Sequence, residues 1–153
     1  MQSLVVHNNQ KVKAYCLPQL DLKIIAEQII HKAGYEDWEG SRIESALEEY
    51  KKFLALCKNY PNTPIIPGRD VDTVWHRHIL NTEKYAADCQ SYFGSFLHHR
   101  PHSRIKVGTK EPNEAWVNTL RLYEEMFGIP APMGWLDNQS ICNGGCDSRV
   151  SNS

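Results

Sequence analysis

The chain has 153 residues, which is enough for one domain with a hydrophobic core. Apolar residues make up 41% and charged residues 23%, so the composition is that of a globular protein and excludes a disordered chain. The formal net charge of -1 gives no overall attraction to nucleic acid or to an anionic membrane, and neither is expected as a partner.

The start of the chain has neither the cationic nor the apolar segment of a secretory signal. No apolar run approaches the roughly 20 residues that a membrane span needs. The five cysteines, at positions 16, 57, 89, 142 and 146, are an odd number and are scattered. We therefore expect a cytoplasmic protein with reduced thiols.

Residues 1–17 fit either a pair of strands or an irregular arm. The rest of the first half of the chain predicts two helices. Apolar residues recur at helical spacing from Leu20 to near Gly34. Ser41 and Glu44 have the spacing of a capping box, which predicts that a second helix begins there. This helix should end near residue 57, because residues 60–68 contain three prolines and a glycine and predict a loop.

Three more helices are expected in the second half. The third runs from Asp70, a suitable N-cap, to Leu80. The fourth runs from residue 82, a threonine that can cap it, to residue 93, and Gly94 is a suitable stop. Residues 95–111 are expected to be irregular, and a fifth helix should run from Pro112 to just before Gly128.

These elements together predict an all-α fold, a compact bundle of about five helices with an irregular N-terminal arm and a C-terminal tail. We expect one helical domain over residues 1–136. Residues 137–153 are expected to form a flexible tail that contains glycine, serine and asparagine.

Candidate functional residues concentrate in one part of the chain, which holds five of the seven histidines. Carboxylate and thiol groups lie in the same stretch, and imidazole is the commonest metal ligand in proteins. The donors are Asp72, His76, His78, Asp88, Cys89, His98, His99 and His102.

Helical geometry divides the donors on the third helix. Asp72 and His76 are four residues apart and share a face, so they can hold a metal together, or the carboxylate can orient His76 as a base. His78 lies roughly 200° around the helix from His76. We expect His78 to be a core histidine that bonds to backbone, to Asp88 or to Tyr85.

A metal ion needs further donors, and His98 or His99 can supply one if the following loop folds back. The hypothesis is a divalent metal site, with zinc as the first choice, formed by Asp72, His76 and His98 or His99. The competing interpretation is a hydrogen-bonded network that holds the loop on the helix. Supporting, structural roles are expected for Trp75, His78, Tyr85, Asp88 and Cys89.

A second, weaker candidate is the pair Cys142 and Cys146, which surround Asn-Gly-Gly. Two thiols at this spacing can bind a soft metal or form a disulfide. An exposed tail without either is the favoured interpretation, because the spacing is not that of the redox motif and no second close pair exists.

Three strings within residues 45–101 resemble the glycine-rich domain-containing protein-like family: Asp-x-x-Trp-His-x-His from Asp72, Tyr-x-x-Asp-Cys from Tyr85, and His-His-x-Pro from His98. The resemblance implies a helical domain and no particular activity. The chain departs from the larger members because it has only nine glycines and no long glycine-rich region. A role tied to such a region does not carry over.

Two kinds of function remain open, and the sequence does not decide whether the protein is an enzyme. One is a helical domain with a polar histidine and aspartate site that binds metal. The alternative is a non-catalytic scaffold module, in which the Trp75–His78 segment is structural and the surface binds a protein partner. A cationic loop from Arg100 to Lys110 is a weaker route to RNA.

Overall fold

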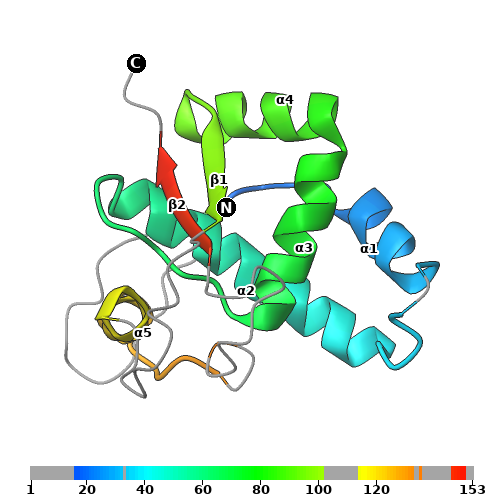
Figure 1. The fold of residues 1–153 in the computed structure, drawn as a ribbon, viewed down its shortest axis with the longest axis horizontal. Coiled ribbons are helices and arrows are strands. Elements are labelled where there is room, and N and C mark those ends of the chain that lie inside the picture. The colour runs from blue at the N-terminus through cyan, green and yellow to red at the C-terminus, as the bar shows by residue number, and fades with distance from the viewer. Residues whose placement is uncertain (1–15, 33, 102–113, 133–134, 136–145, 151–153) are drawn as a thin grey trace.

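The computed structural model describes residues 16–32, 34–101, 114–132, 135 and 146–150, and these form a mainly helical fold (Figure 1). The predicted all-α class, with five helices, is confirmed. None of the helices in these ranges is both long and apolar enough to cross a membrane. The elements are α1 (Lys23–Ile30), α2 (Gly40–Asn59), α3 (Arg69–Leu80), α4 (Thr82–Phe93), β1 (Leu97–Pro101), α5 (Glu114–Phe127) and β2 (Cys146–Val150).

Helices α2 and α3 cross at the centre of the fold (Figure 1). Each contains five consecutive buried residues, 53–57 in α2 and 71–75 in α3, so both helices are covered on every side at these points. Helix α1 packs against α3, α4 continues from the end of α3, and α5 packs against α2. The segment 71–75 contains Asp72 and Trp75, so two candidate functional residues lie in the core.

Helix ends follow the predictions in part. Helices α4 and α5 are each followed by a glycine with positive φ, Gly94 and Gly128, both at 73°, so these stops are confirmed. The capping box is wrong, because α2 begins at Gly40 and Ser41 therefore lies inside the helix, with its hydroxyl bonded to the side chain of Glu39.

The caps predicted for α3 and α4 are also wrong, each by one or two positions. Gly68 precedes α3, and Asp70 lies in the first turn, where its two carboxylate oxygens accept hydrogen bonds from Arg42 at 3.0 Å. Asn81, and not Thr82, occupies the cap position of α4. Asp70 is therefore engaged in an ion pair with α2 and is not available as a cap.

A short antiparallel sheet is the main departure from the predicted fold. Strand β1 lies in the segment expected to be irregular, and β2 lies in the tail expected to be flexible. Leu97 pairs with Val150, and Pro101 pairs with Cys146. Strands that are distant in sequence and only five residues long leave little periodic signal, so no local pattern predicted them. The single domain over residues 1–136 stays a prediction, and the arm at residues 1–15 lies outside the described ranges.

Glu49 on α2 joins three parts of the fold. Its side chain is 14% exposed, and Oε2 accepts hydrogen bonds from the Tyr123 hydroxyl and from Nε1 of Trp135, each at 2.8 Å. Oε1 pairs with Lys52 at 3.0 Å. Since Tyr123 and Trp135 are both fully buried, this carboxylate fixes α5 and the side chain of Trp135 on α2.

Replacing Glu49 with alanine should lower the free energy of unfolding by about 2–4 kcal/mol, because two buried donors lose a charged acceptor. The matched control is Glu48→Ala, since Glu48 is 61% exposed and, among the described residues, pairs only with Lys51 three positions later. It should change stability by less than about 0.5 kcal/mol. Urea denaturation measures both variants, and equal effects would show that Glu49 does not have this role.

Candidate metal centre

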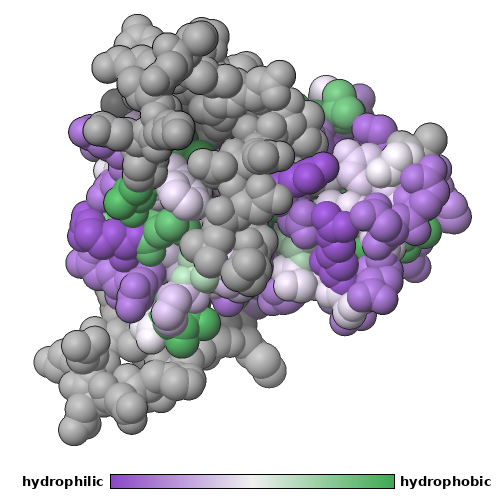
Figure 2. Space-filling model, turned by 60° about the horizontal axis from the view of Figure 1, so that its bottom comes forward, coloured by the Kyte–Doolittle hydropathy of each residue, from purple (hydrophilic) through white to green (hydrophobic). Residues whose placement is uncertain are grey.

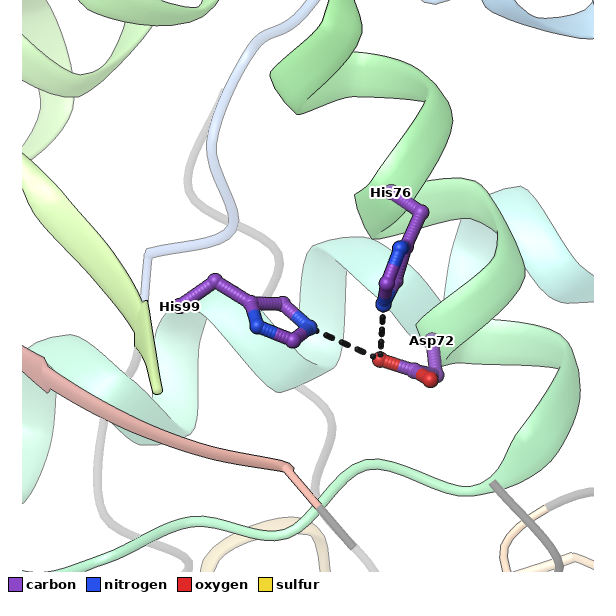
Figure 3. Close-up of side chains that lie close together, drawn as sticks. All are labelled: Asp72, His76 and His99. Atoms are coloured by element: carbon purple, nitrogen blue, oxygen red, sulfur yellow. Dashed lines mark hydrogen bonds and ion pairs between the residues drawn. The ribbon is translucent and has the colours of Figure 1, made fainter. Parts of the chain in front are cut away.

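Three side chains from two elements converge beside α3 (Figure 3). Asp72 and His76 project from successive turns of α3, and His99 reaches them from β1. Oδ1 of Asp72 lies 3.3 Å from Nε2 of His76 and 3.3 Å from Nε2 of His99. One donor atom from each residue lies within 4.8 Å of the other two, which is close enough for all three to contact one ion.

The carboxylate at the centre of this group is fully buried, whereas the side chains of His99 and His76 are 11% and 36% exposed. Oδ2 of Asp72 has no hydrogen-bond partner among the described residues. A buried carboxylate oxygen without a partner is costly and uncommon in folded proteins. The group therefore has one buried, unsatisfied acceptor and one side that opens toward solvent at His76.

The charge of Asp72 is set by its two imidazole neighbours. Burial by itself raises the pKa of Asp72, but hydrogen bonds and charge from His76 and His99 outweigh it, and the net pKa is lowered. Asp72 is thus a carboxylate at neutral pH, which is the form that binds cations.

Strand geometry decides between the two histidines of β1. Successive side chains in a strand point to opposite faces, so only one of His98 and His99 can face α3. His99 does so, and its ring centre lies 4.3 Å from that of Trp75. His98 is exposed and packs near Phe96, with 4.9 Å between the ring centres.

A chain of buried hydrogen bonds holds β1 against α3 and α4. Nε1 of Trp75 donates to the Tyr85 hydroxyl at 3.0 Å, and this hydroxyl donates to the carbonyl oxygen of Leu97 at 2.5 Å. Leu97 is the first residue of β1, two positions before His99. The aromatic pair therefore helps to place His99 at Asp72.

His78 lies outside this group, in a separate buried network. Its Nε2 is 2.7 Å from Oδ2 of Asp88, and its Nδ1 is 2.7 Å from the Tyr50 hydroxyl. Because a carboxylate only accepts hydrogen bonds, Nε2 carries the proton, and Nδ1 of the neutral ring accepts from Tyr50. Burial lowers the pKa of His78, although Asp88 opposes the shift.

Cys89 lies apart from the three-residue group. Cys89 is buried, and burial raises the pKa of its thiol, so it behaves as a small core residue. His102, Cys142 and the side chain of Cys146 lie outside what the structure describes, so their roles stay predictions. The sequence did not predict the contact between Tyr50 and His78, because the two residues are 28 positions apart and lie on different helices.

The chain is similar to one protein family and to two curated proteins. The model of the UCP032817-like family matches residues 8–123. Glycine-rich domain-containing proteins 2 and 1 of Arabidopsis thaliana are each 29% identical to the chain over 90 residues. These matches cover 56% of the chain but only 11% of each relative's length. No solved structure matches the chain.

Tyr85→Phe should lower the free energy of unfolding by about 2–4 kcal/mol, because the Trp75 indole and the Leu97 carbonyl both lose a buried partner. Tyr92→Phe on the same helix is the control, since within the described part of the chain its hydroxyl makes one hydrogen bond, to the carbonyl oxygen of Cys16, at an exposed site. It should cost less than about 1 kcal/mol. Chemical denaturation compares the two, and an equal loss would contradict the role of Tyr85.

The His78 ring should stay neutral below the ordinary histidine pKa of about 6.5. Because folding lowers this pKa, the ring's contribution to stability is complete above the unfolded-state pKa and is lost as pH falls through the folded-state pKa. NMR titration of the ring, in the native protein and in urea, measures both values. A native pKa at or above the value in urea would be the contrary result.

Proposed function

The chain belongs to the UCP032817-like family, and we propose that this member binds one divalent metal ion through Asp72, His76 and His99. The observation that carries the proposal is the buried carboxylate of Asp72. Its Oδ1 contacts two imidazole nitrogens, whereas its Oδ2 has no hydrogen-bond partner among the described residues. A cation at this point would neutralise the carboxylate and give its second oxygen a partner.

The spacing of the donor atoms supports the proposal. Nitrogen and oxygen ligands lie about 2.0–2.1 Å from zinc, so two ligands at a tetrahedral angle are about 3.4 Å apart. Both distances from Asp72 to the histidines are 3.3 Å. This value is slightly long for a hydrogen bond, whose usual range is about 2.7–3.2 Å. The side chains can therefore exchange the hydrogen bonds for an ion with little movement.

The ligand set favours a site that keeps a position open. Structural zinc sites use four protein ligands, whereas catalytic sites use three and leave the fourth position for water or substrate. Zinc is our first choice because two imidazoles and one carboxylate suit it. The same ligands also serve iron(II) in other proteins, so metal analysis must include iron.

The names of the relatives state no ligand or reaction, so the proposal depends on the geometry of this chain alone. The aligned segment is a small part of each relative, and no activity is transferred from the whole proteins. A scaffold module, in which the three residues form only a hydrogen-bonded network, is the outcome if no metal binds.

The test is the metal content of the full chain, purified without chelator and then reconstituted with zinc or iron(II). We expect near-stoichiometric metal in the wild type and its loss in His99→Ala, because one of three ligands is removed. His98→Ala is the matched control, since it changes the adjacent residue of the same strand, and it should retain the metal.

Circular dichroism should show that both variants are folded, so that loss of metal is not loss of structure. Asp72→Asn offers a second, nearly isosteric change that removes the central charge, and it should also abolish binding. A wild-type protein that binds no metal after reconstitution would overturn the proposal. Equal losses in His98→Ala and His99→Ala would overturn the assigned ligands.

A further inference from the structure

A pocket of about 380 Å³ lies beside the candidate metal centre, between the connection from α1 to α2 and helix α3. This volume is within the usual range of small-molecule sites, about 300–1,000 Å³. The lining residues that matter here are Lys32, Tyr35, Arg42, Arg69 and Thr73.

A smaller hollow of about 100 Å³ shares lining residues with this pocket and is also lined by the candidate ligand His76. Its lining includes Lys32, Tyr35 and Thr73, which also line the larger pocket, and it adds Arg77 and the candidate ligand His76. The two hollows therefore adjoin, and His76 is the residue that belongs to both the hollow and the centre.

One face of α3 supplies this arrangement. Arg69, Thr73, Arg77 and Leu80 follow one another at intervals of three or four residues, and they lie along the same side of the helix. His76 is on this side too, because it is three residues after Thr73 and four before Leu80. The candidate metal ligand His76 and the arginines of the pocket therefore lie on one rigid helix. This fixes the direction from the pocket to the candidate metal site.

The charges of the pocket are mainly positive. Arg42 is held by Asp70 at 3.0 Å and by Asp37 at 3.3 Å, and its guanidinium lies 4.3 Å from the Trp38 ring centre, so it forms a fixed wall. On the same part of the molecule, where α1 and the start of α2 lie, Figure 2 shows a mostly hydrophilic surface.

Arg69 and Arg77 differ from Arg42, because neither guanidinium has an ion pair or hydrogen bond within the described ranges. Lys32 also has no carboxylate partner there, and its ammonium lies 5.4 Å from the Tyr35 ring centre. Three cations without anionic partners therefore border the path that leads to His76.

We propose that this pocket binds the carboxylate or phosphate group of a small anionic molecule and directs the rest of that molecule toward the metal centre. The proposal rests on the proposed function, because it names the class of ligand for the same centre. Arginine binds carboxylate and phosphate through paired, charge-assisted hydrogen bonds, and no described side chain competes for the guanidinium groups of Arg69 and Arg77.

The first experiment uses the full chain in EDTA, so that it tests the pocket without the metal. Inorganic phosphate and succinate are titrated separately by calorimetry at constant ionic strength. We expect one of them to bind in the metal-free protein, and the Arg69→Gln, Arg77→Gln double variant to bind it at least roughly tenfold more weakly. Preference for phosphate indicates a phosphorylated ligand, and preference for succinate indicates an organic acid.

Arg121→Gln is the matched control, because Arg121 lies on α5, away from α1 in Figure 1, and is 63% exposed beside Glu125. It should leave the affinity unchanged. Binding of neither anion, or equal weakening by the control, would overturn the anion pocket whether or not the protein binds metal.

A second titration uses metal-loaded protein, in which the preferred anion should bind more tightly than in EDTA. Equal affinity with and without metal would overturn the link between the pocket and the centre, while the anion pocket would stand. Failure to load metal would instead count against the proposed function alone, because the first titration is independent of it.

Discussion

The burial of one carboxylate, that of Asp72, is the constraint on which the site depends. An ionised group in the core must be met by opposite charge or by hydrogen bonds. Asp72 lies where α3 is covered on all sides, and only His76 and His99 reach it among the described residues. His99 comes from a different element, β1. The hydrogen bonds from Trp75 through Tyr85 to β1 therefore also help to provide Asp72 with a partner, because they place His99 beside it.

The two histidines of α3 have different roles, because residues two positions apart face nearly opposite sides of a helix. His76 faces Asp72 at the edge of the core, whereas His78 faces the interior and is held between Tyr50 and Asp88. The inner ring has both nitrogens satisfied and a lowered pKa, which suits a structural role. The outer site has an unsatisfied carboxylate oxygen and an approach from solvent, which suits a ligand.

Much of this arrangement follows from local sequence patterns, and the rest depends on contacts between distant residues. Helical spacing predicted that Asp72 and His76 share a face and that His78 does not. The choice of His99 over His98 required knowing which face of β1 packs on α3, and no local pattern encodes that contact. The same is true of Tyr50 and of the pocket at Lys32, since both are formed by helices that meet only in the folded chain.

X-ray absorption at the metal edge of the loaded protein identifies the ligand atoms without altering the chain. A centre formed by Asp72, His76 and His99 should give imidazole scattering from two histidines and nitrogen or oxygen ligands at about 2.0–2.2 Å, with no sulfur. A sulfur shell at about 2.3 Å would contradict it and direct attention to the cysteines at 142 and 146.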